Sequence, residues 1–347
     1  MEIQPIINKL EEYVQIPSVV RYEDSFRNHL SEDFANLGCD IKFDERFLII
    51  SKKNIRNPKV LTAHIDRHGI VINSNLDFEY AAFNANKFYK KDNPSSEKMF
   101  QEAGKRFLNC LVYSYWIRNR LEEGFVKSFD YDLETKTLKF DVDGIKKLES
   151  NLPVSYLSNL KINGPFIDSQ IDNAISIALI YQLVKDGYDG NIIFSTEEEI
   201  GNSWKYVLKA LEKLNLSTKE IINLDTTPYT ERDKIENGLV VLRNKDQHGV
   251  FNPNLVRFLK NKCDELLIPY EMKDEFIEGQ NKKLVTEGQK PKKLGTTELG
   301  RIVEETKGDI NGATIQIPTF NYHTNNETAS IKGLENFYRL VSKVLSN

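Results

Sequence analysis

The sequence is poor in cysteine and histidine, and it contains no long apolar run. Its 347 residues include only three cysteines and five histidines. Cys39, Cys110 and Cys263 lie far apart and form no CxxC pair, which argues against a disulfide framework and against a structural zinc site built from thiolates. No apolar segment approaches the ~18–20 residues needed to cross a bilayer, and the opening MEIQPIINKLEEYV lacks the apolar core of a signal peptide. These absences predict a cytoplasmic protein whose metal ligands, if it binds metal, are carboxylates and histidines.

An excess of positive charge is also absent. The chain has 47 Lys and Arg residues against 51 Asp and Glu residues, which gives a formal net charge of -4. Because general binding to nucleic acid depends on a basic surface, we expect no nucleic-acid partner, and the lack of a spanning segment predicts no membrane partner. A chain of this length forms one large domain or two moderate ones and needs no disulfide bonds to stabilise its fold.

Short apolar runs alternate with helical patterns over most of the chain. Residues 3–14 and 22–37 repeat apolar side chains at helical spacing, whereas 47–50 and 60–63 are short apolar runs typical of buried strands. From residue 163 onward the pattern predicts helices over 172–185, 204–214, 253–267, 297–305 and 331–345, and strands over 191–195, 221–224, 269–272 and 314–318. Such alternation indicates βαβ units. We therefore predict an α/β fold with a mixed, mostly parallel sheet and helices on both faces.

Residues 74–162 interrupt this alternation. A helix start is expected at Pro94-Ser95-Ser96-Glu97, and a long helix is predicted from the apolar stripe through Met99, Phe100, Ala103, Phe107, Leu111, Tyr115 and Trp116. The segment FDYDLETKTLKFDVDG alternates apolar and charged residues, as a hairpin with one solvated face does. We interpret 74–162 as a smaller α+β domain inserted into a discontinuous domain formed by 1–73 and 163–347.

Possible metal ligands follow the expected strands. His64 and Asp66 come directly after the strand at 60–63, and their spacing of two lets Asp66 orient the His64 ring. The other candidates are Asp172 at a helix start, Glu197-Glu198-Glu199 after the strand at 191–195, Asp225 at the end of the strand at 221–224, and His323 after the strand at 314–318. Each of these alone has a common structural explanation as a cap, a turn residue or a charged surface. Together they lie where an α/β sheet presents its carboxyl ends. Burying three consecutive glutamates there costs desolvation free energy unless cations neutralise them or water solvates them.

The same segments resemble a known family. They are His64-Ile65-Asp66-Arg67-His68-Gly69, Ile171-Asp172-Asn173, Glu198-Glu199-Ile200-Gly201, Asp225-Thr226-Thr227 and Tyr322-His323-Thr324-Asn325-Asn326-Glu327. In order, spacing and flanking residues they resemble the glutamyl, or tetrahedral, aminopeptidases, which are dinuclear metallopeptidases of the zinc exopeptidase group. The resemblance extends from the first helix to the last and includes a domain inserted between the first metal histidine and the bridging aspartate. It is weakest between Asp225 and His323.

The resemblance implies a role for each residue. Asp172 would bridge two divalent metal ions, His64 and Asp225 would complete one ion, and Glu199 and His323 would complete the other. Glu198 would be the general base, Asp66 would hold the His64 ring, and Glu327 would support the His323 end. Nitrogen and oxygen ligands without thiolates suit Zn²⁺ first, with Co²⁺ or Mn²⁺ as alternatives. The implied activity is removal of N-terminal residues from short peptides through a metal-bridging water, by a homo-oligomer whose inserted domain is a lid or an assembly element.

Several positions depart from the family pattern. Asn173 is followed by Ala174, where relatives usually carry an arginine, and Gly295-Thr296-Thr297-Glu298 replaces a Gly-Thr-Asp-Ala segment beside the substrate. His68 stands where an apolar residue is usual, and we interpret it as a packing or pocket-rim histidine rather than a third metal ligand. The helix expected between Ser95 and Arg120 has no counterpart in the mostly β inserted domain of relatives. These departures leave substrate preference and assembly open.

The sequence also leaves other functions open. The same site could serve a deacylase or a carboxypeptidase of this group, or the chain could be a metal-binding scaffold without catalysis, which Ala174 and the unusual insert favour and Glu198 disfavours. A glycosidase built on two carboxylates would leave His64 and His323 without a role. No GxSxG elbow, motif cysteine or phosphate-binding glycine loop occurs in the sequence.

Overall fold

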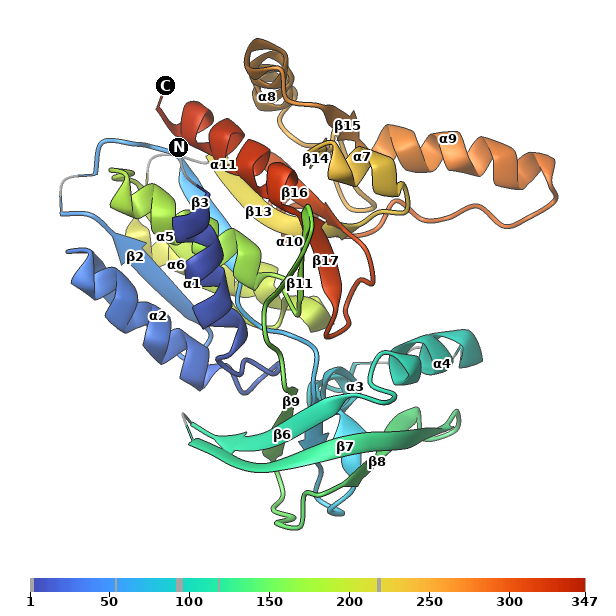
Figure 1. The fold of residues 1–347 in the computed structure, drawn as a ribbon. Helices are drawn as coiled ribbons and strands as arrows, with labels where there is room; N and C mark the ends of the chain where they lie inside the picture. The colour runs from blue at the N-terminus through green and yellow to red at the C-terminus, as the bar shows by residue number, and fades with distance from the viewer. Residues whose placement is uncertain (1–2, 54, 92–95, 118, 217–219, 347) are drawn as a thin grey trace.

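The computed structural model describes residues 3–53, 55–91, 96–117, 119–216 and 220–346. These residues form a larger α/β part and a smaller β-barrel at one end of it (Figure 1). In the described part of the chain, no helix is long and apolar enough to span a bilayer.

The larger part is built on an eight-stranded sheet in the order β1-β2-β12-β3-β13-β16-β14-β15. Its strands are β1 (Asp40–Phe43), β2 (Phe47–Ser51), β3 (Val60–His64), β12 (Asn191–Ser195), β13 (Glu220–Pro228), β14 (Val240–Leu242), β15 (Tyr270–Met272) and β16 (Asn311–Thr319). The central pairs β12–β3, β3–β13 and β13–β16 are parallel, whereas β1–β2, β2–β12 and β14–β16 are antiparallel. The pair β14–β15 is also parallel, so the predicted mixed, mostly parallel sheet is confirmed.

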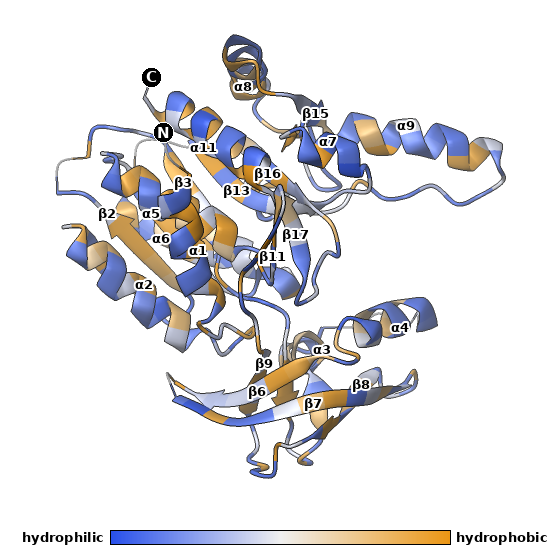
Figure 2. Cartoon of the chain, in the orientation of Figure 1, coloured by the Kyte–Doolittle hydropathy of each residue, from blue (hydrophilic) through white to orange (hydrophobic). Residues whose placement is uncertain are grey.

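Helices lie on both faces of this sheet, as expected (Figure 1). The α-helices described in the larger part are α1 (Gln4–Val14), α2 (Asp24–Asn36), α5 (Ala174–Lys185), α6 (Ser203–Leu214), α7 (Arg232–Glu236), α8 (Pro253–Leu266), α9 (Lys273–Thr286), α10 (Glu298–Glu305) and α11 (Ile331–Leu345). Helix α5 is apolar around nearly its whole circumference and is the most deeply buried, because α1 packs on its outer side. Helix α9, which was not predicted from the sequence, projects from the body and is mostly hydrophilic (Figure 1, Figure 2).

The smaller part is a closed six-stranded barrel in the order β4-β5-β8-β7-β6-β9. The strands are β4 (Ile70–Ile72), β5 (Phe78–Tyr80), β6 (Leu111–Trp116), β7 (Asn119–Asp132), β8 (Thr137–Asp143) and β9 (Leu152–Tyr156), and the helices α3 (Ala81–Phe88) and α4 (Glu97–Lys105) accompany them. The barrel has a hydrophobic core of its own, in which Phe107 stacks on Tyr156 with ring centroids 4.6 Å apart. The predicted hairpin is confirmed as β7 and β8.

The long helix predicted through Trp116 is wrong. Helix α4 ends at Lys105, and Leu111, Tyr115 and Trp116 belong to strand β6. Phe107, Leu111 and Tyr115 are four residues apart and so satisfy the helical period. Asn109, between the first two, has a left-handed backbone (φ 61°), which excludes a continuous helix through Leu111 and Tyr115. The run LVYSYW is rich in β-branched and aromatic residues, and strands β7 and β9 supply its backbone partners. Pro94 and Ser95 lie outside the described residues.

A small three-stranded sheet, β10-β11-β17, brings together two chain segments that contribute to the site. It consists of β10 (Lys161–Asn163), β11 (Phe166–Ser169) and β17 (Glu327–Ser330), all antiparallel. Ser169 pairs with Glu327, so the segment that enters α5 at Asp172 lies beside the segment that follows His323. Two regions separated by about half of the chain are thereby held together.

Candidate metal centre and active site

The parallel centre of the sheet brings the predicted ligands together. His64 is the last residue of β3 and pairs in register with Ser195, the last residue of β12, so the glutamates after β12 emerge beside His64. Asp225 lies on the neighbouring parallel strand β13. Because the carboxyl ends of parallel strands meet at one edge, side chains far apart in the sequence share one site. Asp172 and His323 approach that edge from the small sheet.

Asp172 lies between two histidines. Its Oδ1 is 3.2 Å from Nε2 of His64, and its Oδ2 is 3.5 Å from Nε2 of His323. The two oxygens of one carboxylate therefore face two different imidazoles, and the site has two halves that share Asp172.

The first half contains His64, Asp172 and Asp225. Oδ1 of Asp225 is 3.6 Å from Nε2 of His64, and one potential ligand atom from each of the three residues lies within 4.8 Å of the others. Gln316, which was not among the predicted site residues, donates from Nε2 to Oδ2 of Asp225 at 3.3 Å and accepts from Nε of Arg243 at 2.7 Å. A polar glutamine inside the apolar strand β16 was the available signal for this role.

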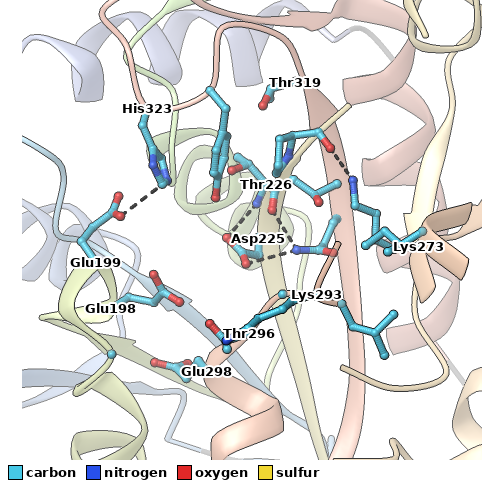
Figure 3. A pocket seen from close by; sticks show the side chains of 18 of the residues that line it. Glu198, Glu199, Asp225, Thr226, Lys273, Lys293, Thr296, Glu298, Thr319 and His323 are labelled. Atoms are coloured by element: carbon cyan, nitrogen blue, oxygen red, sulfur yellow. Dashed lines mark hydrogen bonds and ion pairs between the residues drawn. The ribbon is translucent and has the colours of Figure 1, made fainter. Parts of the chain in front are cut away.

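The second half contains Glu199 and His323. Nε2 of His323 is 3.5 Å from Oε2 of Glu199, and the two side chains face each other across the site with Glu198 beside them (Figure 3). His68 belongs to this half as well, because its Nε2 is 2.7 Å from the same Glu199 oxygen. His68, Glu199 and His323 each offer one potential ligand atom, and these three atoms lie within 4.8 Å of one another. His68 is buried, as a packing histidine would be, but it lies at the centre of the site rather than at the rim.

Two buried acids hold the backbone that carries these side chains. The carboxylate of Asp66 accepts hydrogen bonds from the backbone N–H groups of Glu198 at 2.9 Å and Glu199 at 3.0 Å, and its main-chain oxygen lies 3.1 Å from Nδ1 of His64. Glu327 accepts from the backbone N–H groups of Asp172 at 2.8 Å and His323 at 2.5 Å. His323 has a left-handed backbone (φ 65°), which this contact stabilises.

The three consecutive glutamates do not share one role. Glu197 has a left-handed backbone (φ 63°) and turns away from the site to an ion pair with Arg46 at 3.3 Å. Its carboxylate also accepts hydrogen bonds from Tyr89, Asn202 and Tyr206. The sharp turn at Glu197 directs Glu198 and Glu199 to the site, in the short 3₁₀ helix η1 (Glu198–Ile200).

The electrostatics of the site favour a bound cation. Burial, with the neighbouring carboxylates adding to it, raises the pKa of Glu198 and of Glu327 well above the usual carboxyl range, and burial raises the pKa of Glu199 to about 7. Oδ1 of Asp172, Nε2 of His68 and Nδ1 of His323 are buried without a hydrogen-bond partner in the described residues. Carboxylates and imidazoles packed together, with some of their polar atoms unpaired, form the donor set that divalent metals such as Zn²⁺ prefer. The residues present therefore fit the metals that the resemblance implies.

A cleft of about 1310 Å³ opens above these residues. Glu198, Glu199, Asp225 and His323 line its inner end (Figure 3). Arg243, Lys273, Phe276 and Lys293 line the wall that α9 and its neighbouring loops provide, and Asn86, Met99 and Lys136 come from the barrel side. The site is thus open to a molecule of peptide size from the junction of the two parts.

Known proteins are similar to this chain in sequence or in fold. A protein from Acetivibrio thermocellus whose assigned name is an aminopeptidase is 20% identical over 99% of this chain and 100% of its own length. The aminopeptidase APDkam598 from the archaeon Desulfurococcus kamchatkensis superposes with a TM-score of 0.72 at 15% identity, covering 99% of this chain and 95% of that one. The TET1 peptidase of Pyrococcus horikoshii superposes with a TM-score of 0.67 at 16% identity, covering 98% and 99%.

The comparison of families gives the same result. The profile of the M42 glutamyl aminopeptidases matches residues 144–340, which is more than half of the chain and includes Asp172, Glu199, Asp225 and His323. The family expected from the sequence motifs is therefore confirmed, and the chain belongs to the M42 glutamyl aminopeptidase family of peptidases.

Proposed function

We propose that this protein is a two-metal aminopeptidase that removes N-terminal residues from short peptides. The observation that carries the proposal is the position of Asp172, whose two carboxylate oxygens each face a different histidine. A carboxylate in this position is suited to bridge two cations. His64 and Asp225 would complete one ion, and Glu199 and His323 the other.

The metal ions would be Zn²⁺, with Co²⁺ or Mn²⁺ as alternatives, because the ligands are nitrogen and oxygen atoms. Two such ions activate a water molecule and polarise the scissile carbonyl when they are bound in a site of this kind. The described residues supply no cysteine to this site, since all three thiols lie buried elsewhere.

Glu198 is the proposed general base. It lines the cleft beside Glu199 but is not part of either group of potential metal ligands in the described residues (Figure 3). The hydrogen bond from its N–H to Asp66 fixes its backbone. A carboxylate held beside the reacting centre can take a proton from the attacking water and pass it to the leaving amine, a role typically worth about 10²–10⁴ in rate.

The inserted domain at 74–162 is proposed to act as a lid and an assembly element. Asn86, Met99 and Lys136 place one wall of the cleft on this domain. Its strands β6 and β7 also expose large apolar side chains, with Leu111 at 53%, Trp116 at 55% and Phe125 at 39% of their surface. The related P. horikoshii TET1 peptidase can assemble into a tetrahedron or a large octahedral shell. We therefore propose that this chain forms a homo-oligomer.

The test is hydrolysis of a mixed pool of short peptides by the zinc-loaded protein, read by mass spectrometry, with Glu198→Gln as the variant. We expect stepwise loss of N-terminal residues, a fall of about 10²–10⁴-fold in the variant, and unchanged zinc content. Glu212→Gln on the exposed face of α6 is the matched control and should retain full activity.

Three results would contradict the proposal in different ways. Full activity of Glu198→Gln would remove the assigned base. Faster cleavage of an N-acetylated pool than of the free pool, or loss of residues from the carboxyl end, would identify a deacylase or a carboxypeptidase. Zinc binding without turnover of any pool would identify a non-catalytic scaffold.

A further inference from the structure

His68 occupies a position in the site that the family resemblance assigns to no ligand. Only 5% of its surface is exposed, its Nε2 lies 2.7 Å from Oε2 of Glu199, and its ring centroid is 4.1 Å from that of His323. It lies between β3 and β4, where the chain leaves the sheet and enters the barrel. It therefore reaches Glu199 and His323 from the barrel side.

The Nε2 atom of His68 has no hydrogen-bond partner in the described residues, although Glu199 is so near. The two atoms are therefore 2.7 Å apart without a hydrogen bond between them. An unpaired, buried ring nitrogen costs free energy of desolvation that nothing in the surrounding protein offsets. A cation among Nε2 of His68, Oε2 of Glu199 and Nε2 of His323 would supply the missing partner.

The other ring nitrogen is arranged as in a metal-binding histidine. Nδ1 of His68 lies 2.6 Å from the hydroxyl of Tyr80 on β5, and Arg106 in turn hydrogen-bonds to Tyr80. A histidine that binds metal through one nitrogen usually donates its other N–H to an oxygen, which fixes the ring and its tautomer. The phenol oxygen can accept from both Arg106 and His68, because it has two lone pairs.

We propose that His68 is an additional ligand of the second metal ion, alongside Glu199, His323 and the shared Asp172. Tyr80 is its positioning residue. His68 does not line the cleft, whereas Glu199 and His323 do, so it approaches the ion from the side away from the substrate and leaves the cleft side open. This inference rests on the two-metal site of the proposed function.

The direct test counts imidazole ligands in the unmodified protein. X-ray absorption spectroscopy of protein loaded with two zinc ions should give three imidazoles per two ions, from His64, His68 and His323, at the usual Zn–N distance of about 2.0–2.1 Å. Two imidazoles per two ions would overturn the inference, and this measurement needs no variant that must fold.

Variants provide an independent test. His68→Val replaces the imidazole by an apolar side chain, and it should weaken binding of one of the two zinc ions at least tenfold and change the visible spectrum of the Co²⁺-loaded protein. Tyr80→Phe should weaken the same ion, within the ~10–100-fold range typical for loss of a partner of a metal-binding histidine. His248→Val removes a histidine that pairs with Glu304 away from the site, and it should change neither property.

The outcomes separate this inference from the proposed function. If the protein binds no divalent ions, both fail. If it binds two ions with unchanged affinity and an unchanged Co²⁺ spectrum in His68→Val, the two-metal site stands and His68 is only a packing residue.

Discussion

The carboxylate of Asp66 accepts a hydrogen bond of 2.9 Å from the backbone N–H of Glu198. Its second oxygen accepts from the N–H of Glu199 at 3.0 Å, so one side chain fixes both the proposed base and a proposed ligand. Asp66 follows β3 and the two glutamates follow β12, and the bonds therefore lock two neighbouring strand ends to each other. This explains why a residue that contacts no substrate can control the geometry of the site.

Replacement of Asp66 by Asn should disturb both strand ends. An amide has a single accepting oxygen, so one of the two backbone N–H groups would face the NH₂ group instead. We expect zinc affinity and peptide turnover to fall by about 10–100-fold, as is typical for partners that orient metal ligands. Competition with a chromophoric chelator measures the affinity. Asp141→Asn on the exposed face of β8 serves as control, and equal affinity in both variants would contradict the assigned role.

Removal of metal should lower the stability of the protein. Asp172 and Asp225 are buried close to each other, and without cations their charges repel. Binding at 100 times the dissociation constant stabilises a folded protein by about 2.7 kcal/mol, so the melting temperature should rise as zinc is added to the chelated protein. Asp172→Asn should abolish most of this rise. A melting temperature independent of zinc would contradict a metal centre at this position.

Lys273 should make stability depend on pH. It is buried, it donates to the main-chain oxygen of Pro228, and burial, followed by repulsion from Arg243, lowers its pKa to about 7. The unfolded chain keeps this proton up to the ordinary value of 10.5, so between pH 7 and 10.5 the unfolded state binds more protons and stability rises with pH. The slope is at most about 1.4 kcal/mol per pH unit.

The variant Lys273→Met isolates this contribution. In metal-free protein, the free energy of unfolding of wild type relative to Lys273→Met should increase as the pH rises from 7 towards 10. Lys282→Met, on the exposed face of α9, should show a constant difference across the same range. A flat profile for both variants would show that Lys273 titrates as an exposed lysine does.

Two glycines should respond in opposite directions to alanine. At Gly312 in β16 a Cβ atom would lie 1.8 Å from the main-chain oxygen of Ile221 on the neighbouring strand, which only separation of the two strands can relieve. Gly312→Ala should cost at least about 1–3 kcal/mol of unfolding free energy. At Gly279 in α9 nothing lies within 4 Å of an added Cβ, and Gly279→Ala should stabilise the helix by up to about 1 kcal/mol. Denaturant unfolding of both variants measures the difference.

Assembly should depend on the exposed apolar surface of the barrel. Light scattering after size exclusion should give a mass that is a multiple of the chain's 40.1 kDa. Trp116→Glu places a charge on the exposed end of β6 and should reduce that mass, whereas Val285→Glu on α9, where the replaced side chain is also exposed, should not. A monomer in wild type at micromolar concentration would contradict the proposed homo-oligomer.

The sequence by itself determined the α/β fold and the group of residues at the site. Buried strands are short apolar runs and helices repeat every three to four residues, so both patterns are readable locally. His64, Asp225 and Glu199 could be selected together because parallel strands bring their carboxyl ends to one edge, whatever the details of packing. The motifs around them were sufficient to predict the family.

Tertiary structure decided the rest. The four-residue spacing of Phe107, Leu111 and Tyr115 is compatible both with a helix and with the observed turn and strand. Only the pairing of β6 with β7 and β9 selects the strand. The side chains of Glu197 and Glu199 point in opposite directions because the backbone of Glu197 is left-handed. An ion pair with Arg46 and three hydrogen bonds to the Glu197 carboxylate stabilise this conformation. His68 could be recognised beside Glu199 only once the barrel had placed Tyr80 against its ring. Contacts between residues distant in sequence determine these features, so they cannot be predicted from a local sequence pattern.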